Sequence, residues 1–173
     1  MNPHQLSDVE LARETAVEAG RLLLRHRSDF GPVASDDKPR LKELRDSADR
    51  TAHLLIMDRL RTARPNDAIL SEEGADNEER LSAARTWIVD PLDGTWEYGQ
   101  NRGDFGVHIA LWHGGIAPQL GASVVELPAQ GRTRTTADND PRLPNIPADR
   151  PLRVLCSRTR PPANIDEVAA RWA

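Results

Sequence analysis

Apolar residues recur at helical spacing in two long stretches near the start of the chain. In the first, Ser7 and Glu10 have the spacing of a capping box, and we expect a helix from Ser7 to about Arg27. Its expected buried stripe is Val9, Ala12, Ala16, Ala19 and Leu23. Residues 28–45 carry glycine and proline among charged side chains and are expected to form a loop.

A second helix is expected to begin near Ser47 and to end at Pro65-Asn66-Asp67. Its buried stripe would be Ala48, Ala52, Leu55, Ile56 and Leu60. A last helix is expected after its cap at Asn164, with one apolar face formed by Ile165, Val168, Ala169 and Trp172.

Between these helices, short apolar runs bounded by turn residues predict strands. They cover residues 68–70, 86–89, 107–112, 120–127 and 152–156, with 131–136 as a hairpin partner. Residues 74–85 and 137–151 are expected to be loops. The pattern predicts an α+β fold: a main domain over residues 1–136, a loop over 137–151, and the start of a further α/β domain over 152–173.

Composition narrows the class of protein. The 173 residues carry a formal net charge of −4, which gives no electrostatic reason to expect a nucleic-acid polymer or a membrane as partner. Cys156 is the single cysteine, so no disulfide or cysteine-based zinc site is expected, and we expect it to be a small buried strand residue. With no signal-peptide pattern and no apolar run of about 20 residues, we expect a cytoplasmic location.

Acidic residues crowd residues 67–97, and three of them stand apart. Glu72, Asp90 and Asp93 each follow an apolar strand or lie in a turn containing proline and glycine. Carboxylates directed into one cleft repel one another, and a hard divalent cation such as Mg²⁺ removes that penalty because it prefers oxygen ligands. The sequence therefore predicts a magnesium site here, with Mn²⁺ as a substitute.

The spacing inside the turn supports this interpretation. Asp90 and Asp93 lie three residues apart, so both carboxylates and the Leu92 carbonyl can point at shared metals, while Thr95 adds a hydroxyl. Two close metals can activate a water and stabilise the leaving oxygen of a phosphate ester. The spacing fits neither an EF-hand nor the Asp-x-Asp of haloacid-dehalogenase phosphatases, and His53 and His108 are expected to be structural residues.

These residues resemble the inositol monophosphatase family. The stretch 87–95, Trp-Ile-Val-Asp-Pro-Leu-Asp-Gly-Thr, is similar to the family signature W-I-[IV]-D-P-[IL]-D-G-T, and Ser71-Glu72-Glu73 is similar to its upstream element. Asp46-Ser47-Ala48-Asp49 resembles the family's Thr-x-x-Asp segment, placed at the start of the second helix. The resemblance implies the N-terminal portion of a layered αβαβα sandwich.

Two further stretches resemble the CysQ-type 3′(2′),5′-bisphosphate nucleotidases. Gly94-Thr95-Trp96-Glu97-Tyr98 is similar to their GT-[KR]-E-F, and residues 103–111 to their G-[ED]-F-x-V-x-I-A-L. Inositol monophosphatases usually have Asn at the position of Glu97, whereas Trp96 departs from the nucleotidase pattern and removes a positive charge. The resemblance implies removal of the 3′-phosphate of 3′-phosphoadenosine 5′-phosphate. The alternatives are inositol monophosphatase activity, or a truncated inactive homologue that binds metal.

The resemblance also implies roles for individual residues. Glu72, Asp90 and the Leu92 carbonyl would bind the first Mg²⁺, and Asp90 and Asp93 the second. Glu72 would orient the attacking water, which Thr95 and Asp49 would help to deprotonate.

The substrate would be a small phosphorylated molecule, a nucleotide bisphosphate or an inositol phosphate. It would contact Glu72, Leu92, Asp93, Gly94 and Thr95, with backbone N–H groups of Gly94 and Thr95 facing the phosphate. The family also has an Asp ligand in a W-D-x-x-A motif, which does not occur in these 173 residues. We therefore expect the C-terminal part of the fold to be missing, and we leave a homodimer open.

Overall fold

The computed structural model describes residues 6–74, 78–115, 118–138, 155–157 and 161–171. The chain divides into two compact units, Met1–Asp138 and Asn139–Ala173. The expected domain boundaries, after residue 136 and after residue 151, are not tested by this division and remain predictions. In the part of the chain that is described, no helix is long and apolar enough to cross a membrane.

Two long helices open the first unit. Helix α1 spans Asp8–Phe30, and Ser7 caps it through the capping box that the sequence predicts. Helix α2 spans Lys38–Ala63. The prediction of a loop throughout residues 28–45 is therefore wrong for residues 28–30, which continue α1, and from Lys38 onward. Asp37 accepts a hydrogen bond from the Arg40 amide as helix cap, and a proline is tolerated in the first turn because the amide it lacks would have no helical partner there.

A five-stranded sheet follows in the order β1-β2-β3-β4-β5. Its strands are β1 Ala68–Ser71, β2 Arg85–Asp93, β3 Gly106–His113, β4 Gln119–Leu127 and β5 Arg132–Thr135. Strand β1 pairs with β2 in parallel, and the other pairs are antiparallel. Short helices η2 Glu78–Leu81, α3 Thr95–Gly99 and η3 Pro128–Gln130 lie between strands. The predicted strands over 68–70, 107–112 and 120–127 and the hairpin at 131–136 are confirmed.

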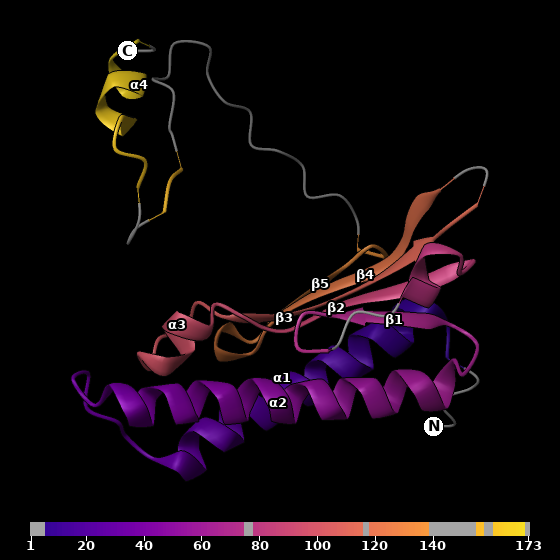
Figure 1. The fold of residues 1–173 in the computed structure, drawn as a ribbon, viewed down its shortest axis with the longest axis horizontal. Coiled ribbons are helices and arrows are strands. Elements are labelled where there is room, and N and C mark those ends of the chain that lie inside the picture. Colours follow the sequence, from indigo (N-terminus) through magenta and orange to yellow (C-terminus); the bar gives the residue numbers. More distant parts are fainter. Residues whose placement is uncertain (1–5, 75–77, 116–117, 139–154, 158–160, 172–173) are drawn as a thin grey trace. The chain divides into compact units, whose positions relative to one another are not determined.

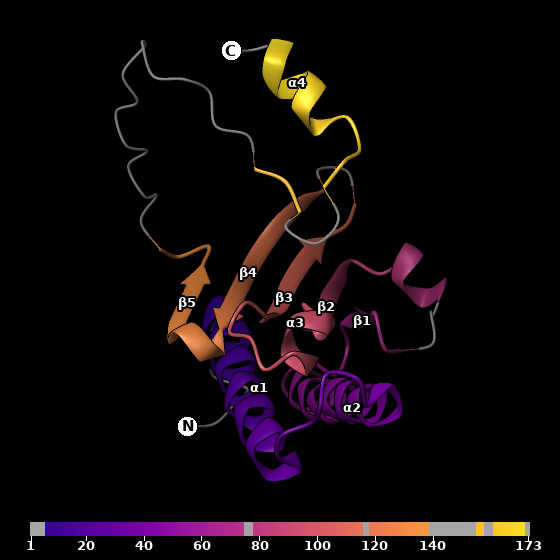
Figure 2. The same cartoon turned by 90° about the vertical axis from the view of Figure 1, so that its left-hand side faces the viewer.

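Helices α1 and α2 cover one face of this sheet (Figures 1 and 2). The core between them contains Ala12, Ala16, Ala19 and Leu23 of α1 and Ala48, Ala52, Ile56 and Leu60 of α2, as the helical spacing predicts. Alternate residues of β3, Val107, Ile109 and Leu111, face the same core. Burial of these side chains is what fixes the register of the sheet, because a shift by one residue would turn them to the other face. The mixed fold predicted from the sequence is confirmed.

Aspartates hold the N-terminal end of α1 to the sheet edge. Asp8 accepts hydrogen bonds from Arg64 Nε at 2.9 Å and from Arg85 at 3.0 Å, and these partners lower its pKa against the opposing effect of burial. Asp67 accepts from Arg85 and from the indole N–H of the fully buried Trp87. The network joins α1 and the α2–β1 connection to the start of β2.

In the second unit, helix α4 spans Ile165–Arg171. The prediction of a strand over 152–156 is not confirmed: residues 152–154 lie outside the described part, and Leu155 and Cys156 are not in a strand. The prediction that Cys156 is buried is wrong, since it is exposed. The expected loop over 137–151 and Trp172 fall largely outside the described residues.

Candidate functional site

The acidic turn at residues 90–93, predicted to follow a strand over residues 86–89, is part of strand β2 itself. Strand β2 continues through Asp90 to Asp93, so the prediction that Asp90 ends the strand is wrong. Its pairing with β3 is interrupted between Asp90 and Asp93, where Pro91 cannot donate a ladder hydrogen bond. Asp90 and Asp93 therefore lie on either side of an irregularity in the sheet.

Hydrogen bonds within the turn fix three of the predicted site residues. The Leu92 amide donates to Asp90 Oδ1 at 3.1 Å, and the Thr95 hydroxyl donates to the Leu92 carbonyl at 3.0 Å. Leu92 is itself buried, so its side chain anchors the turn in the core while its carbonyl faces Thr95. The structure thus brings Asp90, Leu92 and Thr95 together, as the sequence predicts.

Gly94 is required where the strand turns into helix α3. Its φ of 79° lies in the left-handed region, and a Cβ there would approach the Asp104 carbonyl oxygen to 2.9 Å. Both constraints exclude other side chains at this position. A helix begins at Thr95, but it spans only five residues, so its dipole is small.

Glu72 reaches the same region from the end of β1. Its amide donates to the Val89 carbonyl at 3.2 Å, which ties it to β2 one residue before Asp90. The neighbouring Ser71 hydroxyl lies 2.9 Å from His53 Nδ1 on α2. His53 therefore has the structural role that the sequence analysis assigned to it: it holds the end of β1 against α2.

Asp49 lies in the middle of α2, and not at the helix start expected from the sequence, because the helix begins at Lys38. Burial is the main cause that raises the pKa of Asp49 to about 7, and the charges of Glu73, Asp90 and Glu72 add to it. Its Oδ1 atom is buried without a hydrogen-bond partner in the described part of the chain. No hydrogen bond joins Asp49 and Thr95 among the described residues, since the Thr95 proton is directed to Leu92.

Asp90 is surrounded by further negative charge. Burial is the largest cause that raises the pKa of Asp90 to about 6, and the charges of Glu72 and Asp93 also raise it. The hydrogen bond from the Leu92 amide and the charge of His108 lower it. The carboxylates of Glu72, Asp90, Asp93 and Asp49 are linked by these mutual electrostatic effects on the pKa values of Asp49 and Asp90, and we call them the carboxylate cluster. Their mutual repulsion favours a bound cation or a proton.

Two residues join this cluster that were not predicted to belong to it, Glu73 and His108. The charge of Glu73 is, after burial, the largest cause of the raised pKa of Asp49, so the two carboxylates lie close together. His108 Nε2 lies 3.5 Å from Asp93 Oδ2, and in the β2–β3 register His108 is opposite Asp90. His108 was expected to be structural. Only the strand register could have revealed its place beside the two aspartates, and the sequence pattern does not give that register.

The residues present fit a magnesium ion, although they do not form a closed cage. Within the described ranges, no three His, Cys, Asp or Glu side chains are arranged as a ready metal site. Mg²⁺ usually keeps several waters and takes only one or two protein carboxylates, with substrate phosphate oxygens completing its shell. The unpartnered Asp49 Oδ1 and the raised pKa of Asp90 are the features that a cation would relieve.

A hollow of about 530 Å³ lies beside the cluster on the sheet. Glu72, Asp90 and His108 line its polar part, and its apolar part contains Leu70, Ile88, Ala110 and Val125. Ile88 is 42% exposed, in contrast to its core-facing neighbours Trp87 and Val89. The cluster thus opens onto a partly apolar surface large enough for a small organic molecule.

The positive charge that Trp96 does not supply is present on a neighbouring helix. The Arg45 guanidinium of α2 lies 5.7 Å from the centre of the exposed Trp96 ring. This cation–π contact places a cation over α3, one residue beyond Thr95. A positive group therefore lies beside α3, next to Trp96.

Comparison with known proteins gives consistent matches. The model of the inositol monophosphatase family matches residues 5–148. The chain is 41% identical over 182 residues to a 3′-phosphoadenosine 5′-phosphate phosphatase of Mycobacterium leprae, covering 98% of this chain and 63% of that protein. It is 38% identical to the 3′(2′),5′-bisphosphate nucleotidase CysQ of Shigella flexneri, covering 70% of this chain and 52% of that protein.

Solved structures show the same fold. CysQ from Bacteroides thetaiotaomicron is similar with a TM-score of 0.58 and 31% identity, covering 74% of this chain and 45% of that one. The suppressor protein SuhB from Bartonella henselae gives a TM-score of 0.58 at 29% identity, with 72% and 45% covered. The chain therefore spans between about half and two thirds of the length of these relatives.

Proposed function

The chain belongs to the inositol monophosphatase family, and on that premise we propose a Mg²⁺-dependent phosphomonoesterase that removes the 3′-phosphate of 3′-phosphoadenosine 5′-phosphate. The family is metal-dependent, typically with Mg²⁺. The convergence of Glu72, Asp90, Asp93 and Asp49 carries the proposal, because repelling carboxylates at the end of a strand need a cation to stay ionised together.

Each residue of the cluster has a proposed task. Glu72, Asp90, Asp93 and the Leu92 carbonyl would hold the metal. When bound, Mg²⁺ supplies a Lewis acid that offsets charge on the phosphoryl group and lowers the pKa of a water. Glu72 would orient the attacking water. The Thr95 hydroxyl donates a hydrogen bond to the Leu92 carbonyl. The lone pairs of the hydroxyl oxygen are therefore free to accept a hydrogen bond from that water.

Proton transfer and substrate orientation would involve the surrounding residues. Asp49 would accept a proton from the water, and burial is the main cause that raises the pKa of its carboxyl to about 7 in the metal-free chain. The N–H groups of Gly94 and Thr95 would contact the phosphate, and the hollow beside Asp90 offers apolar surface for the organic part of the substrate. The cytoplasmic location and a homodimer remain predictions of the sequence.

Phosphate release from two substrates tests the proposal. The protein should hydrolyse 3′-phosphoadenosine 5′-phosphate with a kcat/KM at least about tenfold above that for inositol 1-phosphate, and EDTA should stop both reactions. An Asp36→Asn variant, which changes an exposed carboxylate, serves as the control. Equal kcat/KM values would refute the nucleotidase assignment, and absence of metal-dependent release from either substrate would refute the enzymatic proposal.

A further inference from the structure

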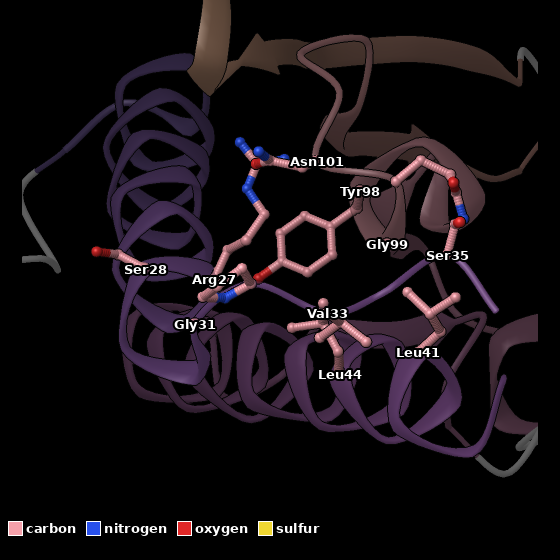
Figure 3. Close-up of a pocket in the computed structure, with 12 residues that line it drawn as sticks. Arg27, Ser28, Gly31, Val33, Ser35, Leu41, Leu44, Tyr98, Gly99 and Asn101 are labelled. Carbon is pink, nitrogen blue, oxygen red and sulfur yellow. The ribbon is translucent and has the colours of Figure 1, made fainter. Parts of the chain in front are cut away.

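A second pocket lies away from the carboxylate cluster, where the C-terminal end of α1, the 31–35 loop, α2 and the end of α3 meet (Figure 3). We call it the corner pocket. Its volume is about 380 Å³, and its lining includes Arg27, Val33, Leu41, Leu44 and Tyr98. None of the proposed metal-binding or catalytic residues lines it, so the proposed phosphatase reaction leaves this pocket without a role.

Arg27 is the charged group of the corner pocket. Its guanidinium lies 5.2 Å from the centre of the Tyr98 ring and 4.9 Å from that of Phe105, and one nitrogen donates to the Arg102 carbonyl at 2.7 Å. These contacts hold the guanidinium in one place. Figure 3 shows it extending along the Tyr98 ring toward Asn101. A fixed guanidinium of this kind is suited to binding an anionic oxygen group.

The charge of Arg27 has no carboxylate partner in the described part of the chain. Burial lowers the pKa of Arg27, and the only opposing contribution comes from Tyr98. Arg27 as a whole is only partly buried. Partial burial of an unpaired cation is unfavourable, and an anion bound beside it would offset that cost.

The opposite side of the corner pocket is apolar. Leu41 and Leu44 are buried on α2, and Val33 of the loop lies beside them (Figure 3). A cation facing an apolar floor is the pattern of a site for a molecule with a charged group and a hydrocarbon or aromatic body. The volume of the pocket suits a ligand smaller than a dinucleotide.

We propose that the corner pocket binds a small organic anion, with Arg27 contacting the anionic group and Val33, Leu41 and Leu44 contacting the apolar body. The site is independent of the proposed phosphatase activity. No lining residue of the corner pocket belongs to the carboxylate cluster: helix α3 contributes Thr95 to the proposed catalytic site at its first residue, and Tyr98 and Gly99 to the corner pocket at its other end.

Amide chemical shifts in the metal-free chain, titrated with benzenesulfonate, test the proposal. We expect shifts at Gly31, Gly99 and Asn101, and an affinity for benzenesulfonate above that for inorganic phosphate, which lacks the apolar body. Arg27→Met should weaken binding at least about tenfold. Arg25→Gln removes the same charge from an exposed position on α1 and should leave the affinity unchanged.

Two further variants keep the test decisive. Val33→Phe fills the floor while retaining Arg27, so it should weaken benzenesulfonate binding even if Arg27→Met fails to fold. Asp90→Asn alters the carboxylate cluster alone and should leave binding intact, which separates this proposal from the proposed function. Unchanged affinity in both Arg27→Met and Val33→Phe, equal affinity for phosphate, or shifts confined to Leu70, Ile88 and Val125 would overturn it.

Discussion

The Thr95 hydroxyl donates a hydrogen bond to the Leu92 carbonyl oxygen across 3.0 Å, and this contact joins two groups with different proposed tasks. A carbonyl oxygen has two lone pairs, so Leu92 can accept from Thr95 and still offer one lone pair to a cation. The hydroxyl in turn is left as an acceptor toward water. The turn is therefore arranged for metal binding and water orientation by the same hydrogen bond.

Asp49→Asn should make the metal-free protein more stable at alkaline pH. The pKa of Asp49 is raised to about 7 from an ordinary value of 3.8, so the folded state binds its proton more tightly than the unfolded state. This contribution to the free energy of unfolding is complete below about pH 4 and is lost as the pH rises toward about 7. Asparagine removes that loss.

Urea denaturation in EDTA at pH 5 and pH 8 measures this effect. The stability gained by Asp49→Asn should be larger at pH 8 than at pH 5, and Asp58→Asn, an exposed carboxylate on the same helix, should show no such difference. A variant less stable than the parent at pH 8 would mean that the Asp49 carboxylate is stabilised by a partner, contrary to its unpaired Oδ1 atom.

Gly94→Ala should disrupt the metal-binding turn. The left-handed φ of 79° and the approach of a Cβ to within 2.9 Å of the Asp104 carbonyl oxygen together predict a loss of about 2–4 kcal/mol of stability. Gly131→Ala is the matched control, since Gly131 is also left-handed, with φ 60° and ψ 36°, but has no contact within 4 Å of its Cβ position. Thermal unfolding of both variants separates the contribution of the steric contact. Equal losses of stability in the two variants would show that the Asp104 carbonyl moves aside at little energetic cost.

Tyr98→Phe should loosen helix α3. The buried Tyr98 hydroxyl donates to the Leu23 carbonyl at 2.9 Å and lies 3.2 Å from His26 Nδ1, so its removal leaves a buried carbonyl of α1 without this donor. We expect a loss of about 1–2 kcal/mol in urea denaturation. Ser47→Ala, on the other side of His26, should cost less because that hydroxyl mainly bonds the carbonyl of Glu43 within its own helix. A larger loss for Ser47→Ala would contradict this assignment.

The elements with strong periodicity could be predicted from the sequence. The stripes of α1 and α2 face the core as expected, and β3 forms where a strand was predicted, because hydrophobic burial determines both patterns. The start of α2 could not be predicted from the sequence. Pro39 lies in a charged segment, and such a proline indicates a loop unless it is known to lie in the first turn of a helix. The continuation of β2 through Pro91 was missed for a related reason: proline is tolerated where the strand pairing is irregular.

The candidate site was predicted unevenly. Asp90, Leu92 and Thr95 lie within one turn, so their proximity follows from chain geometry and was predictable from the spacing. Glu73 and His108 join the cluster through the packing of α2 on the sheet and through the β2–β3 register. Such tertiary relationships are set by the whole core and have no local sequence signal.

Calorimetric titration with Mn²⁺ tests most directly whether the carboxylate cluster binds a metal. The 173-residue chain should bind Mn²⁺, and Asp90→Asn should weaken that binding at least about tenfold, because asparagine can still accept from the Leu92 amide but has lost the charge. Asp36→Asn should bind like the parent. Equal Mn²⁺ affinity in the parent and in Asp90→Asn, or no binding by the parent, would contradict the assignment of this cluster as a metal site.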